Sequence, residues 1–95
     1  MTFEYDKEAD ALYIRVLDGT PIARTEQIDP GTLVDVDDGG RVVGIDVVRP
    51  GRAVPIAEVT DRFELDDKDM AVLRALWPED GAYPFADAKP DLVLA

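Results

Sequence analysis

The chain of 95 residues lacks cysteine and histidine, and serine and asparagine are missing from its sequence as well. Without cysteine there is no disulfide, no thiolate nucleophile and no cysteine-based metal site. Without histidine the chain also lacks the commonest general base and the commonest zinc ligand. Ser-His-Asp, Cys-His and His-metal mechanisms therefore cannot be built from this chain alone. We expect a protein that is not an enzyme and needs no cofactor, and we assign it no catalytic residue and no metal ligand.

Positive charge is scarce, because 10 Lys and Arg residues stand against 21 Asp and Glu residues and leave a net charge of −11. A surface with this field repels phosphate backbones and anionic membranes. We therefore expect no nucleic acid and no membrane among the partners. The expected partner is a protein, either a second copy in a homo-oligomer or a basic protein. Two other interpretations stay open, because acidity also keeps a small protein soluble and occurs in salt-adapted hosts.

Long hydrophobic runs are missing too, since none approaches the roughly 20 apolar residues that span a bilayer. Residues 1–6 are acidic and lack a signal-peptide pattern, so we expect a cytoplasmic protein. The length and the apolar content of 46% fit one globular domain. Within that domain we expect a sheet over residues 1–60, and a helix with an irregular C-terminal extension over residues 61–95.

Alternating apolar and polar residues, the period of a half-buried strand, recur through the first half of the chain. The predicted strands cover residues 2–6, 11–17, 21–28, 32–37 and 41–48. The alternation is weakest in residues 21–28, and Pro21 suits an edge strand there. Residues 29–31, with the sequence DPG, are predicted to form a turn.

The clearest hairpin joins residues 32–37 to residues 41–48. A two-residue loop of Gly39 and Gly40 would pair Asp38 with Arg41. The same register places Val36 opposite Val43 and Val34 opposite Ile45. A slip of one residue would put these apolar side chains on opposite faces, so the core fixes the register.

The last third of the chain changes from strand to helix periodicity. Asp66 suits the start of a helix, and Pro78 stops it, so we predict a helix over residues 66–77. Its apolar stripe consists of Met70, Leu73, Leu76 and Trp77. Residues 53–59 fit either a short strand or a single helical turn. We expect an irregular tail over residues 79–95, with Tyr83 and Phe85 against the body of the domain.

These elements predict an α+β fold in which β structure dominates. We expect an antiparallel β-meander of four to five strands over residues 2–48. A sheet this small needs a cover for its apolar face, so the single C-terminal amphipathic helix should pack on that face. The face is predicted to consist of Leu12, Ile14, Val34, Val36, Val43 and Ile45.

Two stretches resemble a known family. Residues 5–14, with the sequence YDKEADALYI, and residues 34–47, with VDVDDGGRVVGIDV, resemble the signatures of the domain of unknown function (DUF) 2283 family of small bacterial and archaeal proteins. The resemblance covers roughly residues 3–50. It implies a small antiparallel sheet and no established activity. Some members of the family occur together with small toxin-like proteins, so the resemblance also implies an antitoxin role. The chain has Asp46 where the family usually has Glu, and the residues after the match inherit nothing from it.

Several acidic residues form a candidate ligand or interaction face. Asp35, Asp37 and Asp46 are expected together on one face of the sheet. Tyr13 and Arg15, from a neighbouring strand, complete this candidate face. The bound species would be a basic protein or, alternatively, a hard cation or small ligand, although the calcium-loop pattern is incomplete. A solvated hairpin rim explains the same acidic residues without any ligand.

Two further features have a structural and a functional interpretation. Gly44, inside a strand, marks a bulge or the close approach of an aromatic ring such as Tyr13, or it opens a small pocket, and we favour the packing interpretation. Leu73 and Trp77 could anchor a partner, because tryptophan is frequent at interaction hot spots, or could simply cover the sheet. We include both residues in the candidate face and predict an uncharacterised protein-protein interaction module, either a homodimer or an antitoxin-like partner of a basic protein.

Overall fold

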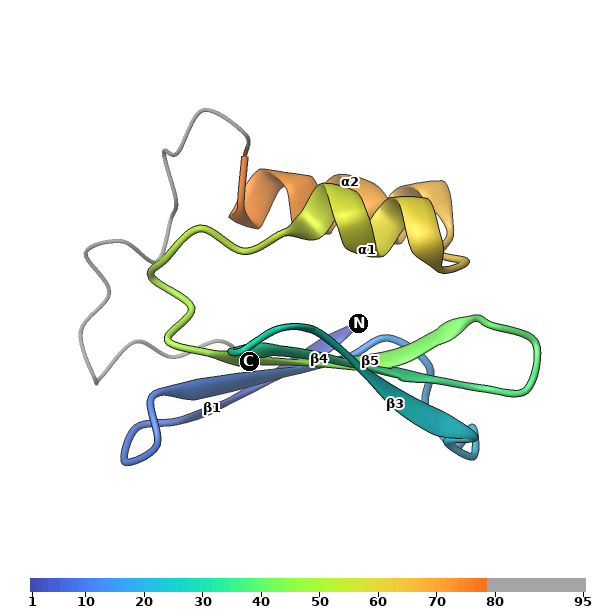
Figure 1. The fold of residues 1–95 in the computed structure, drawn as a ribbon, viewed down its shortest axis with the longest axis horizontal. Helices are drawn as coiled ribbons and strands as arrows, with labels where there is room; N and C mark the ends of the chain where they lie inside the picture. The colour runs from blue at the N-terminus through green and yellow to red at the C-terminus, as the bar shows by residue number, and fades with distance from the viewer. Residues whose placement is uncertain (79–95) are drawn as a thin grey trace.

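A computed structural model, which describes residues 1–78, contains one sheet of five antiparallel strands and two helices. The elements are β1 (Thr2–Asp6), β2 (Ala11–Arg15), β3 (Arg24–Asp29), β4 (Thr32–Val36), β5 (Val42–Val48), α1 (Ile56–Arg62) and α2 (Asp67–Leu76). Both helices lie over one face of the sheet, and no described element covers the other face (Figure 1). The predicted β-dominant α+β class is confirmed. The predicted tail over residues 79–95, with Tyr83 and Phe85, lies outside the described residues.

The strands lie in the order β1-β2-β5-β4-β3, so the predicted meander is wrong. β3, β4 and β5 do follow one another, but β2 pairs with β5 instead of β3. The central strands bury the residues of one face completely, whereas β3 leaves Arg24 and Thr25 exposed. Placing the least apolar strand at an edge buries the most hydrophobic surface. The edge position that the weak alternation predicts for this strand is confirmed.

The β4–β5 hairpin keeps the predicted pairing of Val34 with Ile45 but closes differently. A β-bulge shifts the register, so Val36 pairs with Val42 and not with Val43. The amide of Asp37 donates to the carbonyl of Arg41 (3.0 Å), so the predicted Asp38–Arg41 pairing is wrong and the loop has one residue more. Such a loop ends in a left-handed residue, here Gly40 with φ 84°.

Two helices replace the single predicted one. α1 begins after Pro55, in the segment where the sequence fits both a short strand and a helical turn. α2 matches the helix predicted over residues 66–77, with Asp66 as its N-cap residue and Trp77 as its C-cap residue. Within residues 1–78, neither helix is long and apolar enough to cross a bilayer.

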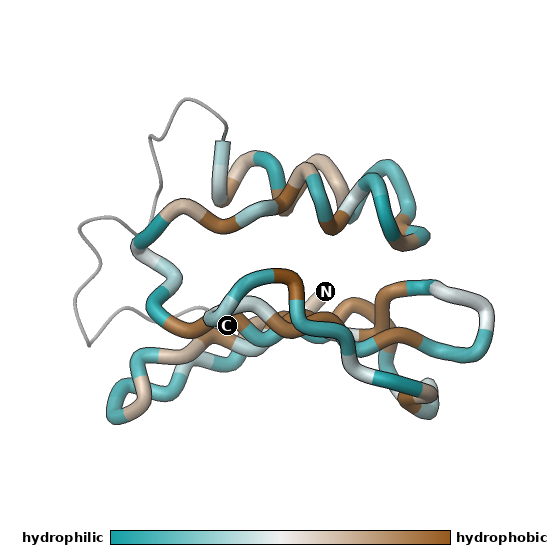
Figure 2. Tube along the Cα trace, viewed as in Figure 1, coloured by the Kyte–Doolittle hydropathy of each residue, from teal (hydrophilic) through white to brown (hydrophobic). Residues whose placement is uncertain are grey.

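The core lies between the sheet and the two helices. Hydrophobic segments occur along the strands and on the helix turns near the sheet, while the hairpin turns are mostly hydrophilic (Figure 2). The cluster consists of Leu12, Ile14, Val34, Val36, Val42, Ile45, Val47, Val54, Ile56, Val59, Phe63, Leu73 and Trp77. Val42 replaces the predicted Val43 because the bulge shifts the alternation of β5. Complete burial of a Val, Leu or Ile side chain stabilises a fold by about 1.5–3 kcal/mol.

Arg52 fastens the β3–β4 turn to the segment after β5. Its guanidinium donates to the buried Thr32 hydroxyl (3.0 Å), to the Asp29 carboxylate (3.1 Å) and to the Val48 carbonyl (2.9 Å). Burial alone would raise the pKa of Asp29, but hydrogen bonds from Thr32 and the Gly31 amide, with the charge of Arg52, lower it. This turn therefore stays attached to the centre of the sheet.

Candidate functional site

The side of the sheet without helices holds most of the predicted candidate residues. We call this side the open face and define it by the side chains at its centre. They are Glu4 of β1, Tyr13 and Arg15 of β2, Asp35 of β4, and Gly44 and Asp46 of β5. Each alternates along its strand with core residues, so the pattern that builds the core also gathers these groups on the opposite side.

Tyr13 lies across Gly44 at the centre of the open face. β2 and β5 pair Tyr13 with Asp46 and Arg15 with Gly44. A Cβ atom at Gly44 would overlap the hydroxyl and ring of Tyr13. The close aromatic approach predicted for this glycine is therefore confirmed, and a bulge also lies nearby in the β4–β5 ladder. Glycine is required because any side chain would occupy the volume of the ring.

Asp35 receives two hydroxyl hydrogen bonds from different strands. The Tyr13 hydroxyl donates to Oδ2 at 2.9 Å, and the Thr25 hydroxyl donates to Oδ1 at 2.5 Å. Burial, followed by the hydrogen bond to the Asp35 carboxylate, raises the pKa of Tyr13 to about 12. The phenol therefore stays protonated at neutral pH and acts as a donor that fixes Asp35. This arrangement holds the Asp35 carboxylate in a fixed position.

Of the two carboxylates Asp35 and Asp46, only Asp35 has its negative charge stabilised by the two hydroxyl hydrogen bonds described above. Asp46 is half-buried beside Tyr13, and it lies diagonally from Asp35 across the β4–β5 ladder. Burial, with a smaller contribution from the negative charge of Asp35, raises the pKa of Asp46. An ionised Asp46 therefore carries an unfavourable free energy that an incoming positive charge would relieve.

Arg15 is the basic member of the open face. Its guanidinium lies 5.8 Å from the centre of the Tyr13 ring, within the range of a cation–π interaction. It forms ion pairs with Glu4 (3.7 Å) and Asp18 (4.0 Å). These contacts direct its charge towards β1 and the turn after β2.

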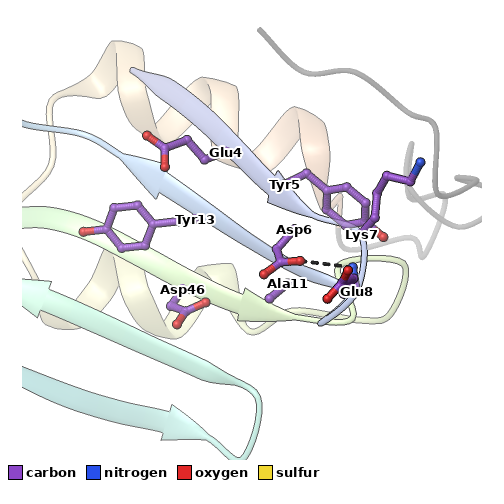
Figure 3. A pocket seen from close by; sticks show the side chains of 8 residues that line it. All are labelled: Glu4, Tyr5, Asp6, Lys7, Glu8, Ala11, Tyr13 and Asp46. Atoms are coloured by element: carbon purple, nitrogen blue, oxygen red, sulfur yellow. Dashed lines mark hydrogen bonds between the residues drawn. The ribbon is translucent and has the colours of Figure 1, made fainter.

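A shallow hollow of about 540 Å³ adjoins the open face where β1 turns into β2 (Figure 3). Its lining consists of Glu4, Tyr5, Asp6, Lys7, Glu8, Ala11, Tyr13 and Asp46. The turn is held by Asp6, whose carboxylate accepts the amides of Glu8 (3.0 Å) and Ala9 (3.3 Å). The Tyr5 hydroxyl donates to Asp10 (2.6 Å), which has a left-handed φ of 49°. The side chains of Tyr5, Asp6 and Asp10 thus have structural roles in the turn.

Three of the predicted site residues lie elsewhere. Asp37 caps the hairpin loop, where its Oδ1 accepts the amides of Gly39 and Arg41 at 2.9 Å each. Leu73 and Trp77 are buried beneath the helices, so their inclusion in an exposed interaction face is wrong. Their side chains cover the sheet, which is the structural interpretation that their spacing also allowed.

Sequence reasoning missed Glu4 as a member of the open face and Thr25 as a hydrogen-bond donor to Asp35. Thr25 reaches Asp35 because β3 pairs with β4, and Glu4 reaches Arg15 because β1 pairs with β2. A register counted outwards from the turn at residues 29–31 would have placed Thr25 opposite Asp35. Within residues 1–78, no group of three or more acidic side chains is arranged to hold a metal ion.

Residues 2–49 match the family described as protein of unknown function (DUF2283). The chain belongs to this family. The DUF2283 match covers all five strands and ends before α1, so it contains the whole open face but neither helix. No curated protein and no solved structure matches the chain.

Proposed function

We propose that this DUF2283 protein is an interaction module that binds a basic protein through the open face. The observation that carries the proposal is Asp46, a half-buried carboxylate with a raised pKa on a sheet face that no described element covers. A Lys or Arg side chain of a partner would offset the repulsion between Asp46 and Asp35. Charge complementarity of this kind supplies specificity and speeds association.

The chemistry around Asp46 favours a protein partner over a substrate. Tyr13 and Thr25 hold Asp35 in place, and their hydroxyl groups are occupied by that carboxylate. Tyrosine is also common at interaction hot spots, where its ring packs and its hydroxyl stays hydrogen-bonded. We therefore propose that the chain is not an enzyme and that its carboxylates act in binding. A small basic toxin is one protein that such an acidic face would bind, in line with the antitoxin role that the family resemblance implies.

The alternative of a cation binder has less support. Ca²⁺ takes six to eight oxygen ligands, and a site for it gathers several carboxylates around one point. Asp37 uses its carboxylate to cap the hairpin loop, and Asp35 already accepts two hydroxyl groups. Asp35 and Asp37 are thus engaged in structural hydrogen bonds.

The test is capture of partners from a host lysate by the immobilised protein, followed by mass spectrometry. The wild type is compared with a Glu4→Gln, Asp46→Asn double variant of the open face. We expect the wild type to recover a specific basic protein that the double variant loses. Recovery should also fall as salt rises, because salt screens attraction between opposite charges.

The matched control is the Asp38→Asn, Asp61→Asn double variant. It removes the same charge from exposed positions on the β4–β5 hairpin and on α1, away from the open face. The control should recover the partner as well as the wild type does. Equal loss in both variants would show that only net charge matters, and recovery of no specific protein by the wild type would contradict the proposal.

A further inference from the structure

The sheet has two edges, β1 and β3, and only one has a sequence that suits pairing with its own copy. An exposed edge strand offers backbone amides and carbonyls to another chain. In β3, Arg24, Thr25 and Gln27 are exposed. The Ala23 amide donates a hydrogen bond to the Val36 carbonyl (2.8 Å). The backbone carbonyl of Val36 in β4 therefore points towards β3.

Backbone groups along a strand point alternately to its two neighbours. Since Val36 bonds towards β3, Val34 does so as well, and its partner in the ladder is Glu26. The backbone of Glu26 is therefore directed to β4, and the backbone groups of Thr25 and Gln27 are directed away from the sheet. Among the described residues 1–78, no strand pairs with these outward groups, so a strand of a second chain can do so.

The charged residues of β3 allow it to pair with an antiparallel copy of itself, because a basic and an acidic residue stand on the two sides of Thr25. Arg24 and Glu26 lie on the same side of the strand, where the Arg24 Nε is 2.7 Å from a Glu26 carboxylate oxygen. In an antiparallel second copy related by a two-fold axis at Thr25, Arg24 of each copy would lie opposite Glu26 of the other. A shift of the axis by one residue would place Glu26 opposite Glu26, and like charges directly opposite each other destabilise a sheet.

The surroundings of this edge favour the same pairing. Arg62 of α1 lies 3.0 Å from Glu26, so two arginines surround one glutamate in an otherwise acidic protein. The β-bulge after Gln27 limits the pairing to the segment before it. The other edge has no such pattern, because β1 carries Glu4 and Asp6 without a basic residue between its ends.

We infer that two copies of the chain associate through β3, antiparallel about Thr25, to join their sheets into one. This association uses an edge that is separate from the open face, so it stands or falls independently of the proposed binding of a basic protein. A two-fold dimer is the commonest closed assembly, and each contact in it occurs twice.

The first test mixes two charge variants and measures mass by sedimentation equilibrium. Arg24→Glu puts two glutamates on β3, and Glu26→Arg puts two arginines there, so each variant alone should dimerise about ten-fold more weakly than the wild type. In the mixture, each unlike pair is restored, so a heterodimer should form with near wild-type affinity. One variant carries only glutamates and the other only arginines at these two positions, so this recovery shows that residues 24 and 26 of the two copies face each other across the dimer.

The second test removes the outward amide. Thr25→Pro deletes a donor that faces away from β4, which an edge strand tolerates, whereas Thr25→Val keeps the donor. Both variants lose the hydroxyl bond to Asp35, so they are matched in that respect. We expect Thr25→Val to dimerise and Thr25→Pro to be monomeric, with circular dichroism confirming that both are folded. If Thr25→Pro does not fold, the charge variants decide alone.

A wild type that stays monomeric at every accessible concentration would overturn the inference. So would a dimer whose affinity in the Arg24→Glu and Glu26→Arg variants equals that of the wild type, because it would form through another surface.

Discussion

At the scale of single residues, Tyr13 and Gly44 form one unit with Asp35. The absence of a side chain at Gly44 makes room for the Tyr13 ring, and the ring carries its hydroxyl to the Asp35 carboxylate. A close approach of this kind was predictable, because a glycine inside a strand often marks a place where another group comes close to the backbone. The link from Tyr13 to Asp35 was not predictable, since it depends on which strands are neighbours.

This contact gives a double-mutant prediction. Gly44→Ala should destabilise the fold by about 1–3 kcal/mol, because its methyl group overlaps the Tyr13 ring. In a Tyr13→Ala background the same substitution should cost much less, since the ring is gone. Urea unfolding of the four proteins in the cycle gives the coupling free energy. Equal costs of Gly44→Ala in both backgrounds would contradict the contact.

Asp46 gives a prediction for the pH dependence of stability. Its raised pKa means that the folded chain binds the proton more tightly than the unfolded chain does. Stability should therefore fall as pH rises from the ordinary value of 3.8 through the raised value. Asp46→Asn removes this cost and should stabilise the protein by about 0.2–1 kcal/mol at neutral pH, the size of one cross-strand repulsion.

Urea unfolding across this pH range measures the effect. Asp38→Asn, at an exposed position of the hairpin loop, is the control and should change stability by less than about 0.5 kcal/mol. An Asp46→Asn variant that is less stable than the wild type at neutral pH would show that the ionised carboxylate stabilises the fold.

At the scale of elements, the sequence predicts which face of a strand is buried better than it predicts which strands are neighbours in the sheet. Alternation identified the core side of β2, of β4 and, beyond the bulge, of β5, because burial of one face imposes a period of two. The same alternation leaves strand order open, and β2 pairs with β5 across a long separation in the chain. The short α1 was hard to distinguish from a strand, because seven residues contain only two helical turns.

α2 provides the prediction at this scale. Leu73→Ala should destabilise the fold by about 2–5 kcal/mol, because the side chain is completely buried against the sheet. Val72, on the same helix, is 37% exposed, and Val72→Ala serves as the control with a change near ~0.5 kcal/mol. Thermal or urea unfolding measures both. A small effect of Leu73→Ala on stability, with loss of partner binding instead, would return Leu73 to the interaction face.

At the scale of the whole molecule, the net charge of −11 acts on both kinds of association. Salt should weaken binding of a basic partner, because it screens attraction between opposite charges. Salt should strengthen pairing of two copies, because screening of the repulsion between two chains that each carry −11 outweighs screening of the Arg24–Glu26 attraction at β3. Sedimentation at low and high salt measures both affinities, and the same sign for both would contradict this account.

The open face is the central claim, and mapping of chemical shifts on the isotopically labelled protein tests it most directly. The captured basic partner is titrated into the labelled chain, and the amide signals of residues 1–78 are followed. We predict that the largest shifts occur at Tyr13, Gly44 and Asp46, with small shifts in α1 and α2. Shifts concentrated on the helices, with Tyr13, Gly44 and Asp46 unchanged, would contradict the account.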